Sequence, residues 1–383
     1  MKKIRPGIKI SLSLAGVILG LFFFTIPALA LPYISSSYYC LVDGKSGQVI
    51  TSRQADVMRP VASTTKMMTA ILTVEYTSPD EIAVVSQHAG RTPQYSIGLR
   101  AGQKVLVSEL LKVALIRSAN DASVVLAEHV AGDEQFFAHL MSKKAFSIGA
   151  INTHFHNASG LPATDHYSTA YDLAQIGRYL LNNDYLRSIV ATRQTTFKHP
   201  GYYKPIIIKN TNTLLTTYSG ADGIKTGTTN AAGKCLVASA TRNKRQLIAV
   251  SLKSGDRRND CATLLEYGFT NSQLAKVIDK SMPFKQLYVS DGRHTSIEVY
   301  PAQDIYLWKT ASTPDIQKRV KVNYVVKAPV YAGQKLGSLT IYVDKKPVMS
   351  TDLLSHQQVD RERNSLFEFL QNLDWAKRIS GSS

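Results

Sequence analysis

Two patterns of apolar and polar positions divide the chain into a mixed first part and a strand-rich second part. In the first part, apolar residues recur at a helical period in five stretches. Four are 59–76, 121–132, 169–183 and 262–269, and the fifth is a helix that begins at Ser108 and Glu109. Short apolar runs predict two strands around a turn in 38–50, then strands at 223–228, 234–241 and 246–252, whereas 184–220 is predicted to be irregular with extended patches. We therefore expect an α/β (α+β) domain over 31–272, in which an antiparallel sheet packs against a helical cluster.

The second part changes to alternating strand patterns separated by Gly and Asp turns. Residues 283–355 are accordingly predicted to form a small all-β domain. Residues 359–379 return to a helical period, with Leu366, Phe369 and Leu373 on one face. Polar residues interrupt this stretch, so we expect an amphipathic helix that lies in a membrane interface rather than one that spans a bilayer. A helix docked on the β-domain is the alternative.

Residues 1–30 have the pattern of a secretory signal peptide. A basic start precedes an apolar run, and Ala28 and Ala30 supply the small residues of a cleavage site. We expect cleavage after Ala30 and export of the chain. An uncleaved anchor helix is the alternative, because the apolar run is long enough to cross a bilayer.

The chain is strongly basic, and it stays so after export. Its net charge is +17, and loss of the four basic residues in the leader lowers this to +13. Export, together with the lack of zinc-finger spacing and of a basic–aromatic block, argues against nucleic acid. The charge suits either a solvated surface or attraction to anionic lipids and wall polymers.

The sequence predicts neither a metal site nor a cofactor. Cys40, Cys235 and Cys261 lie in apolar contexts, so they are predicted to be small buried hydrophobic residues rather than disulfide partners or metal ligands. His154 and His156 have the look of a metal pair, but no third ligand is evident.

Ser63 and Lys66 stand out at the start of the apolar helix 59–76. Their spacing of three places both side chains on one helix face. A serine hydroxyl needs an adjacent base to act as a nucleophile, and burial lowers the pKa of a lysine so that its neutral amine becomes available as that base. The start of a helix also offers backbone N–H groups to a developing oxyanion. Taken alone, this spacing is often coincidental.

Two further motifs make the coincidence improbable. Ser118 and Asn120 belong to "SAND" at the join of two predicted helices, and Lys225, Thr226 and Gly227 form "KTG" on a predicted strand. Either motif alone could be a helix cap or an ordinary strand lysine. Together, in this order and behind an export signal, they indicate a serine enzyme of the kind that penicillin acylates.

With these motifs the chain resembles the low-molecular-mass penicillin-binding proteins that are serine D-alanyl-D-alanine carboxypeptidases. "ASTTKMMTA", "RSANDASVVLAEHVAG", "HNASGLP" and "DGIKTGTTNAAGKCLVASAT" follow one another in family order, and "VVKAPVYAGQKLGSLTIYVDKKPV" resembles the family's C-terminal β-domain. The resemblance implies the penicillin-binding/β-lactamase-like transpeptidase fold and removal of the terminal D-alanine from peptidoglycan pentapeptide stems through an acyl-enzyme. It also implies covalent inhibition by β-lactams, and a place at the outer face of the bacterial cytoplasmic membrane, held at an anionic surface by the terminal helix.

The resemblance also implies roles for the first two motifs. Ser63 would be the acylated nucleophile and Lys66 its base. Ser118 would shuttle protons, and Asn120 would hold the substrate backbone.

The remaining implied roles concern substrate binding. Lys225 would supply positive potential, and Thr226, with Gly227 beside it, would bind the terminal carboxylate. The backbone N–H groups of Ser63 and Thr228 would form the oxyanion hole. Arg257 stands where the family has an arginine and would steer the carboxylate.

Three rival functions remain open. A class A β-lactamase needs a glutamate base in an E-x-x-L-N type loop, and neither Glu128 nor Glu134 begins such a motif. A DD-endopeptidase that cuts cross-links is compatible with the same motifs. A non-enzymatic wall-binding protein is disfavoured because all motif residues are present.

Overall fold

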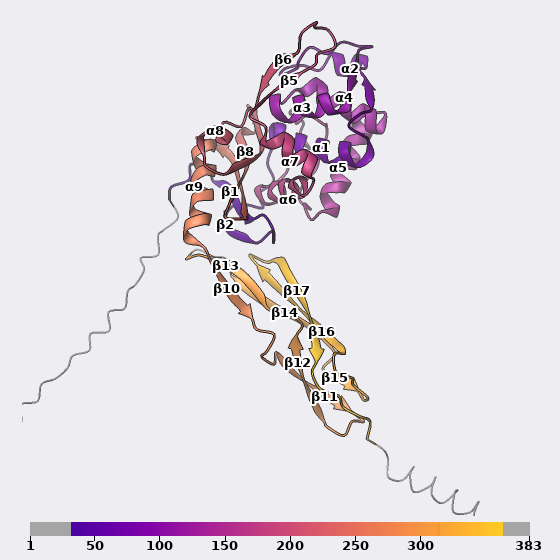
Figure 1. Cartoon of the computed structure of the whole chain (residues 1–383), viewed down its shortest axis with the longest axis vertical. Coiled ribbons are helices and arrows are strands. Elements are labelled where there is room, and N and C mark those ends of the chain that lie inside the picture. Colours follow the sequence, from indigo (N-terminus) through magenta and orange to yellow (C-terminus); the bar gives the residue numbers. More distant parts are fainter. Residues whose placement is uncertain (1–31, 312, 314, 363–383) are drawn as a thin grey trace, which may run out of the picture.

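The computed structural model describes residues 32–362 except 312 and 314. The chain forms two parts that lie end to end, a larger mixed part and a narrower strand-rich part (Figure 1). The predicted signal peptide and residues 363–379 of the predicted terminal helix lie outside the described residues. Val359 and Arg361, just before that segment, form β-bridges with Val330 and Gly292. No helix among the described residues is both long and apolar enough to cross a bilayer.

An antiparallel five-stranded sheet organises the mixed part, in the order β2-β1-β9-β8-β7. Its strands are β1 (Tyr38–Asp43), β2 (Val49–Arg53), β7 (Ala221–Thr229), β8 (Gly233–Arg242) and β9 (Arg245–Ser254). Alternate side chains of each strand point to opposite faces, so the sheet takes part in two separate cores. One face packs against α9 (Arg257–Asn271), and the other packs against the helical cluster.

The helical cluster surrounds α1, which is buried over most of its length. Its helices are α1 (Lys66–Tyr76), α2 (Gln87–Gly90), α3 (Val107–Lys112), α4 (Asn120–Ala131), α5 (Glu134–Ser147), α6 (Ala170–Leu181) and α7 (Asp184–Ala191). Two short turns of other helix types, η1 (Ala62–Thr65) and η2 (Val113–Arg117), precede α1 and α4. The short elements β3 (Ile82–Val84), β4 (Lys104–Leu106), β5 (Gln194–Phe197), β6 (Ile206–Lys209) and α8 (Leu214–Thr217) complete this part.

The helix predictions need correction at three main points, and the short helices α2 and α8 were also not predicted. Ser63 was expected inside the first turn of a helix, but it lies in the 3₁₀ turn η1, and α1 begins only at Lys66. Helix α5 was not predicted. Helix α7 lies in the stretch that was predicted to be irregular. Both helices begin with a side-chain cap, because Asp133 accepts from the N–H of Phe136 and Asn183 from that of Leu186.

The strand-rich part contains a six-stranded sheet in the order β14-β16-β17-β12-β11-β15 and a separate pair, β10 with β13. Its strands are β10 (Gln273–Ile278), β11 (Lys285–Ser290), β12 (Ser296–Pro301), β13 (Ile305–Lys309), β14 (Ile316–Val322), β15 (Val325–Lys327), β16 (Lys335–Val343) and β17 (Lys346–Ser355). All pairings are antiparallel except that of β11 with β15. A compact aliphatic core holds this part together.

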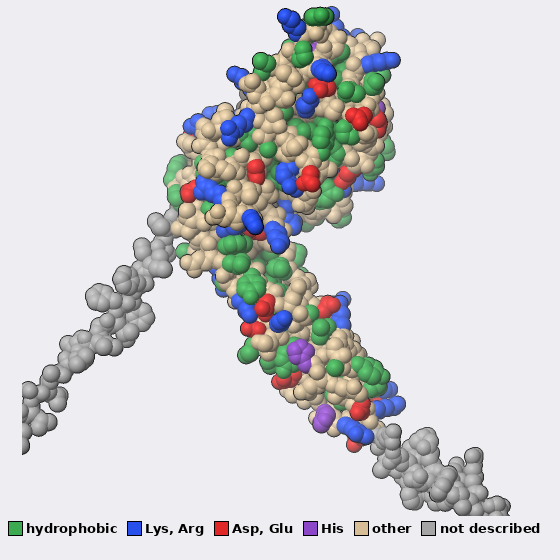
Figure 2. Space-filling model, in the orientation of Figure 1, with side chains coloured by type: hydrophobic (Ala, Val, Ile, Leu, Met, Phe, Trp, Pro, Cys, Tyr) green, Lys and Arg blue, Asp and Glu red, His purple; other side chains and the backbone are tan. Residues whose placement is uncertain are grey.

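Direct contacts join the two parts. The buried Gln48 side chain pairs with the backbone of Trp308 in both directions, and the guanidinium of Arg245 lies 3.3 Å from the centre of the Trp308 ring. A further contact joins Lys346 Nζ, at the start of β17, to Asp56 Oδ1 at 2.8 Å. Lys and Arg side chains are spread over both parts on the face drawn in Figure 2, which fits the basic composition.

Candidate active site

The turn that carries Ser63 is closed by its own neighbours. Thr64 donates its hydroxyl to Val61 O, and Thr65 donates to Ala62 O, each at 2.8 Å. Ala62 has a positive φ of 50°, which is costly for a residue with a β-carbon. The turn therefore presents Ser63 just before α1 in a conformation that the surrounding structure must maintain.

Lys66 is fully buried beside Ser63. Its Nζ lies 2.9 Å from Ser63 Oγ, 2.7 Å from Asn120 Oδ1 and 2.6 Å from Ser159 O. Burial, and secondarily the charge of Lys225, holds the pKa of Lys66 well below the usual lysine range. A neutral amine has two N–H groups and one lone pair. With Asn120 and Ser159 accepting the two N–H groups, the lone pair faces the Ser63 hydroxyl.

The second motif enters the site through irregular backbone. Ser118 follows the π-helical turn η2 and adopts a left-handed conformation, with φ of 71°. Its hydroxyl accepts a hydrogen bond from Lys225 Nζ at 2.9 Å. Two residues later, Asn120 begins α4 and links Lys66 to the opposite wall, because its Nδ2 donates to Gln94 O at 3.0 Å.

Strand β7 supplies the third side of the site. Lys225 is 1% exposed, and burial, followed by the nearby charge of Arg257, lowers its pKa to about 7. Thr226 Oγ1 lies 2.6 Å from Thr211 Oγ1. Arg257 donates to Gly227 O and to Thr228 Oγ1, both at 2.7 Å. These contacts place two cations and two hydroxyls along the strand.

Gly227 allows β7 to run close to the turn that carries Ser63. A β-carbon at this position would lie 2.8 Å from Val61 O and 3.0 Å from Ser63 N. The backbone N–H of Ser63 therefore lies next to β7, which is where an oxyanion hole shared by these two elements would have to form.

Two cavities open on either side of Ser63. The larger, of about 380 Å³, has no charged residue in its lining: Ser63, Pro93, Gln94, Tyr95, Asn120, Gly160, Leu161, Pro162, Thr228, Thr229 and Asn230. The smaller, of about 160 Å³, is cationic: Ser63, Tyr95, Arg117, Ser118, Thr211, Thr226, Gly227, Thr228 and Arg257. The site can thus receive an anionic group on one side of Ser63 and a neutral chain on the other.

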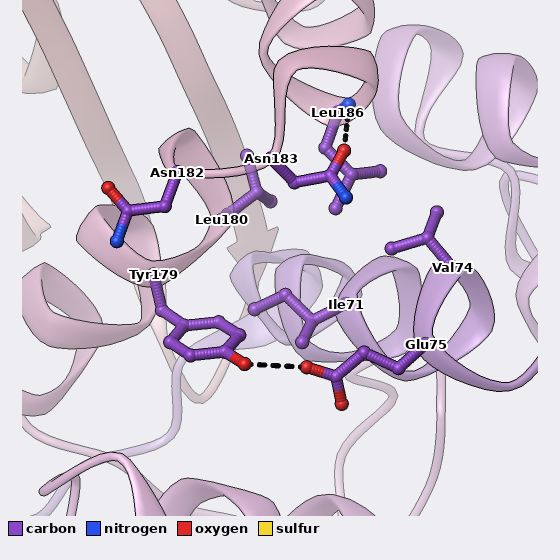
Figure 3. A pocket seen from close by; sticks show the side chains of 8 residues that line it. All are labelled: Ile71, Val74, Glu75, Tyr179, Leu180, Asn182, Asn183 and Leu186. Atoms are coloured by element: carbon purple, nitrogen blue, oxygen red, sulfur yellow. Dashed lines mark hydrogen bonds between the residues drawn. The ribbon is translucent and has the colours of Figure 1, made fainter.

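A third cavity, of about 260 Å³, opens farther along α1 (Figure 3). Ile71 and Val74 of α1 and Leu180 and Leu186 form its apolar surface, and the Tyr179 hydroxyl donates to Glu75 at 2.7 Å across it. None of the motif residues lines this cavity, so it is not the candidate active site.

The structure brings all nine predicted site residues together and adds others that sequence reasoning missed. The carbonyl of Ser159 contacts Lys66, Tyr95 borders both cavities, and Thr211 contacts Thr226. "HNASGLP" held a signal for the first of these, because Asn157 accepts three hydrogen bonds from Ser159 and Gly160 and so shapes the turn. Nothing in the local sequence marks Tyr95 or Thr211.

The structure shows the surroundings of the two candidate histidines and of the three cysteines. His154 and His156 both lie near Asp165, with His156 Nδ1 2.9 Å from its carboxylate. In the part of the chain that the structure describes, no three His, Cys, Asp or Glu side chains are grouped so as to hold a metal ion. Cys40, Cys235 and Cys261 are free and buried, as predicted.

Fold and site together indicate the class of this protein: a serine enzyme, with its candidate nucleophile between a helical cluster and the edge strand of an antiparallel sheet. A family model described as D-alanyl-D-alanine carboxypeptidase matches residues 27–255, and one described as Penicillin-binding protein 5, C-terminal domain, matches residues 273–361. The chain therefore belongs to the D-alanyl-D-alanine carboxypeptidase family, whose members are serine-type hydrolases among the low-molecular-mass penicillin-binding proteins.

Individual relatives agree with this assignment over both parts of the chain. D-alanyl-D-alanine carboxypeptidase DacA of Escherichia coli K12 is 31% identical, with 86% of this chain and 84% of the relative covered. DacF of Bacillus subtilis strain 168 is 30% identical, with 88% and 89% covered. The crystal structure of penicillin binding protein 5 from Haemophilus influenzae superposes with a TM-score of 0.68 at 28% identity, covering 87% of this chain and 100% of the other. The predicted family and the predicted mixed and all-β parts of the fold are confirmed, whereas the terminal amphipathic helix stays a prediction.

Proposed function

We propose that Ser63 is the acylated nucleophile of this carboxypeptidase and that neutral Lys66 is its general base. The observation that carries the proposal is the environment of Lys66 Nζ, which is fully buried, has two acceptors for its N–H groups and lies 2.9 Å from Ser63 Oγ. Ser63 Oγ attacks the carbonyl carbon of the penultimate D-alanine while its proton passes to Lys66. The backbone N–H groups of Ser63 and Thr228 stabilise the oxyanion.

Collapse of the tetrahedral intermediate then releases the terminal D-alanine. The C–N bond breaks, and the leaving amine takes up, through the Ser118 hydroxyl, the proton that Lys66 had accepted from Ser63. Ser118 lines the same cavity as Ser63 and accepts a hydrogen bond from Lys225. A water molecule subsequently hydrolyses the ester on Ser63 and restores the enzyme. Asn120 aligns the acyl part of the substrate while its side chain holds Lys66 in place.

The two cavities assign the ends of the substrate. The cationic cavity, with Thr226, Arg257 and neighbouring Lys225, receives the terminal carboxylate of a D-Ala-D-Ala peptide. The larger uncharged cavity receives the rest of a peptidoglycan stem peptide. β-Lactams place a carboxylate and a reactive carbonyl in the same arrangement and acylate Ser63. Glu134 is engaged with Ala158 N–H and His88, so it does not supply a deacylating base at Ser63.

The proposal extends to location and domain roles. Residues 1–30 direct export. The domain over 31–272 performs catalysis at the outer face of the cytoplasmic membrane, and the β-domain over 283–355 holds this catalytic domain away from the lipid. Val359 and Arg361 are β-bridged to the strand-rich part, so the proposed amphipathic helix on the anionic membrane surface is confined to residues 363–379. Its apolar spacing and the basic residues Lys377 and Arg378 support this role.

Product analysis tests the proposed reaction. We expect the enzyme to release D-alanine from a pentapeptide stem, and Ser63→Ala to release none. Release of D-alanine by Ser63→Ala would contradict the assignment of the nucleophile. Cleavage of cross-linked muropeptides in preference to pentapeptides would instead establish the DD-endopeptidase alternative.

A further inference from the structure

A buried histidine lies behind the nucleophile turn. His166 is 4% exposed, and its ring packs edge-on against Phe155 at a centroid distance of 5.6 Å. Its Nε2 lies 2.7 Å from Thr65 Oγ1, and its Nδ1 accepts a hydrogen bond from the backbone N–H of His156 at 3.2 Å. His166 lines neither cavity beside Ser63, so it does not touch the substrate.

The contacts of Thr65 determine which ring nitrogen carries the proton. The Thr65 hydroxyl has one hydrogen, and it donates that hydrogen to Ala62 O. At the 2.7 Å contact the donor is therefore His166 Nε2–H, while the lone pair of Nδ1 faces the N–H of His156. In the neutral ring, both nitrogens therefore form a hydrogen bond. Protonation of Nδ1 would place its N–H opposite the backbone N–H of His156, so that two donors would face each other.

The charged groups around His166 agree with a neutral ring. Burial lowers the pKa of His166 to about 4, and the nearby Asp165 carboxylate only partly opposes this effect. His166 thus remains a fixed donor to Thr65 throughout the neutral range.

Thr65 connects this donor to the strained part of the turn. Its acceptor, the carbonyl of Ala62, belongs to the residue with positive φ immediately before Ser63. Gly160 packs so closely on the other side that a β-carbon there would lie 2.0 Å from Ala62 O. The adjacent Ser159 carbonyl holds Lys66. The segment 154–168 therefore fixes both the turn of the nucleophile and the position of the base.

We propose that His166 is a positioning residue for acylation: by donating to Thr65, it holds the strained Ser63 turn at the distance from Lys66 that proton transfer requires. The inference rests on the proposed roles of Ser63 and Lys66. It predicts that loss of the His166–Thr65 hydrogen bond slows the chemical step, because a small displacement of a nucleophile is costly, while binding of the substrate is unchanged.

A double-mutant cycle on the acylation rate tests the link. His166→Phe and Thr65→Val each remove the hydrogen bond, and each should slow the first-order acylation step by fluorescent penicillin by roughly 10- to 100-fold without weakening non-covalent binding. The double variant should be no slower than the slower single variant, because both changes remove one link. Thr65→Ser keeps the hydroxyl and should restore most of the rate. His166→Gln, which retains an amide donor, should fall between the wild type and His166→Phe.

His199→Phe is the matched control. His199 is also a buried histidine with a lowered pKa, but it packs against Phe197 and Tyr202, which belong to β5 and the β5–β6 connection, away from the turn. It should lower thermal stability without slowing acylation. Rates are measured on the fraction that becomes labelled, so that partial unfolding does not count as slow chemistry. If His166→Phe yields no folded protein, the proposal is tested by comparing the acylation rates of Thr65→Val and Thr65→Ser.

Two results would overturn the proposal. A normal acylation rate in the labelled fraction of His166→Phe or Thr65→Val would leave His166 only a structural role. Fully additive losses in the double variant would mean that the two residues act independently. Neither result bears on the nucleophile itself, which is tested separately by the Ser63→Ala variant.

Discussion

Burial of Lys66 carries a structural cost that its proposed role as a base would explain. A protonated amine without contact with water is unfavourable, and the folded chain offers Lys66 two neutral acceptors rather than a carboxylate. The nearest carboxylates that oppose the lowered pKa, Asp121 and Glu134, form no hydrogen bond with it among the described contacts. The arrangement stabilises the neutral form, which is the form that can accept a proton.

Lys66→Arg separates charge from basicity. Arginine keeps a positive charge in the site but cannot accept a proton near neutral pH. We expect the rate of penicillin acylation to fall by about 10²-fold or more, the usual scale for removal of a general base. A stopped-flow measurement of fluorescent penicillin binding gives the rate. Near-normal acylation would show that Lys66 acts only through its charge.

The two buried lysines together predict the pH dependence. Below its lowered pKa, Lys66 is protonated and cannot act as a base, so kcat/KM should fall as the pH decreases through that value. Above about pH 7, Lys225 loses its proton and its attraction for the terminal carboxylate, so KM should rise. A pH profile of D-alanine release measures both limbs. A peptide with a C-terminal amide in place of the carboxylate should lack the alkaline limb, and an alkaline limb that is unchanged with the amide would contradict the role of Lys225.

At the scale of elements, the active site depends on close backbone approaches that only glycine permits. Gly160 and Gly132 form a matched pair, because both have positive φ, 84° and 77°, but only Gly160 has a neighbour within reach of an added β-carbon. Alanine should strain the backbone by about 1–2 kcal/mol at either position. Only at Gly160 should it also push Ala62 O, and with it the Ser63 turn, out of place.

We therefore expect the two alanine variants to differ in their rate of acylation rather than in the strain of their backbone. Gly132→Ala should lose about 1 kcal/mol of unfolding free energy and acylate normally. Gly160→Ala should lose acylation by about 10²-fold or more, because the nucleophile is displaced. Urea denaturation and penicillin labelling measure the two effects. Equal acylation by both variants would show that the contact between Gly160 and Ala62 does not position the turn.

Local features of the fold and of the site could be predicted from the sequence, whereas long-range contacts could not. The helix over 169–183 was predicted from its local apolar period, and the structure starts α6 with a cap that is equally local, because Thr169 accepts from the N–H of Asp172 three residues away. The motif residues were predicted because their spacing reflects chemistry. Helix α7 was missed since its short apolar pattern lies among Thr, Asn and Tyr residues. Contacts such as that of Ser159 with Lys66, 93 residues apart, depend on tertiary structure and leave no local pattern.

At the scale of the whole molecule, the candidate active site and the strand-rich part are separate. The motif residues all lie in the mixed part, while contacts such as those of Gln48 with Trp308 hold the β-domain in a defined direction from it (Figure 1). Removal of the C-terminal segment should therefore leave chemistry unchanged. This separation allows the proposed membrane anchor to be tested without disturbing the active site.

A chain ending at Glu362 tests the anchor. It retains the β-bridges of Val359 and Arg361 and should be acylated by penicillin at the normal rate. The full mature chain should sediment with anionic vesicles, less completely at high salt, whereas the truncated chain should not. The full chain with Lys377→Gln and Arg378→Gln is the matched control, and its binding should weaken on anionic vesicles only. Equal vesicle binding by the full and truncated chains would contradict the anchor.

The central claim, that Ser63 is the residue acylated, is tested most directly by locating a penicillin adduct by mass spectrometry. Trypsin should release residues 54–66 as one peptide, because the bond after Arg59 precedes a proline and resists cleavage. This peptide contains Ser63, Thr64 and Thr65 as its hydroxyl residues. Our account predicts one penicilloyl group per chain, assigned to Ser63 by fragmentation of this peptide. An adduct on any other residue, or a stoichiometric adduct in Ser63→Ala, would contradict it.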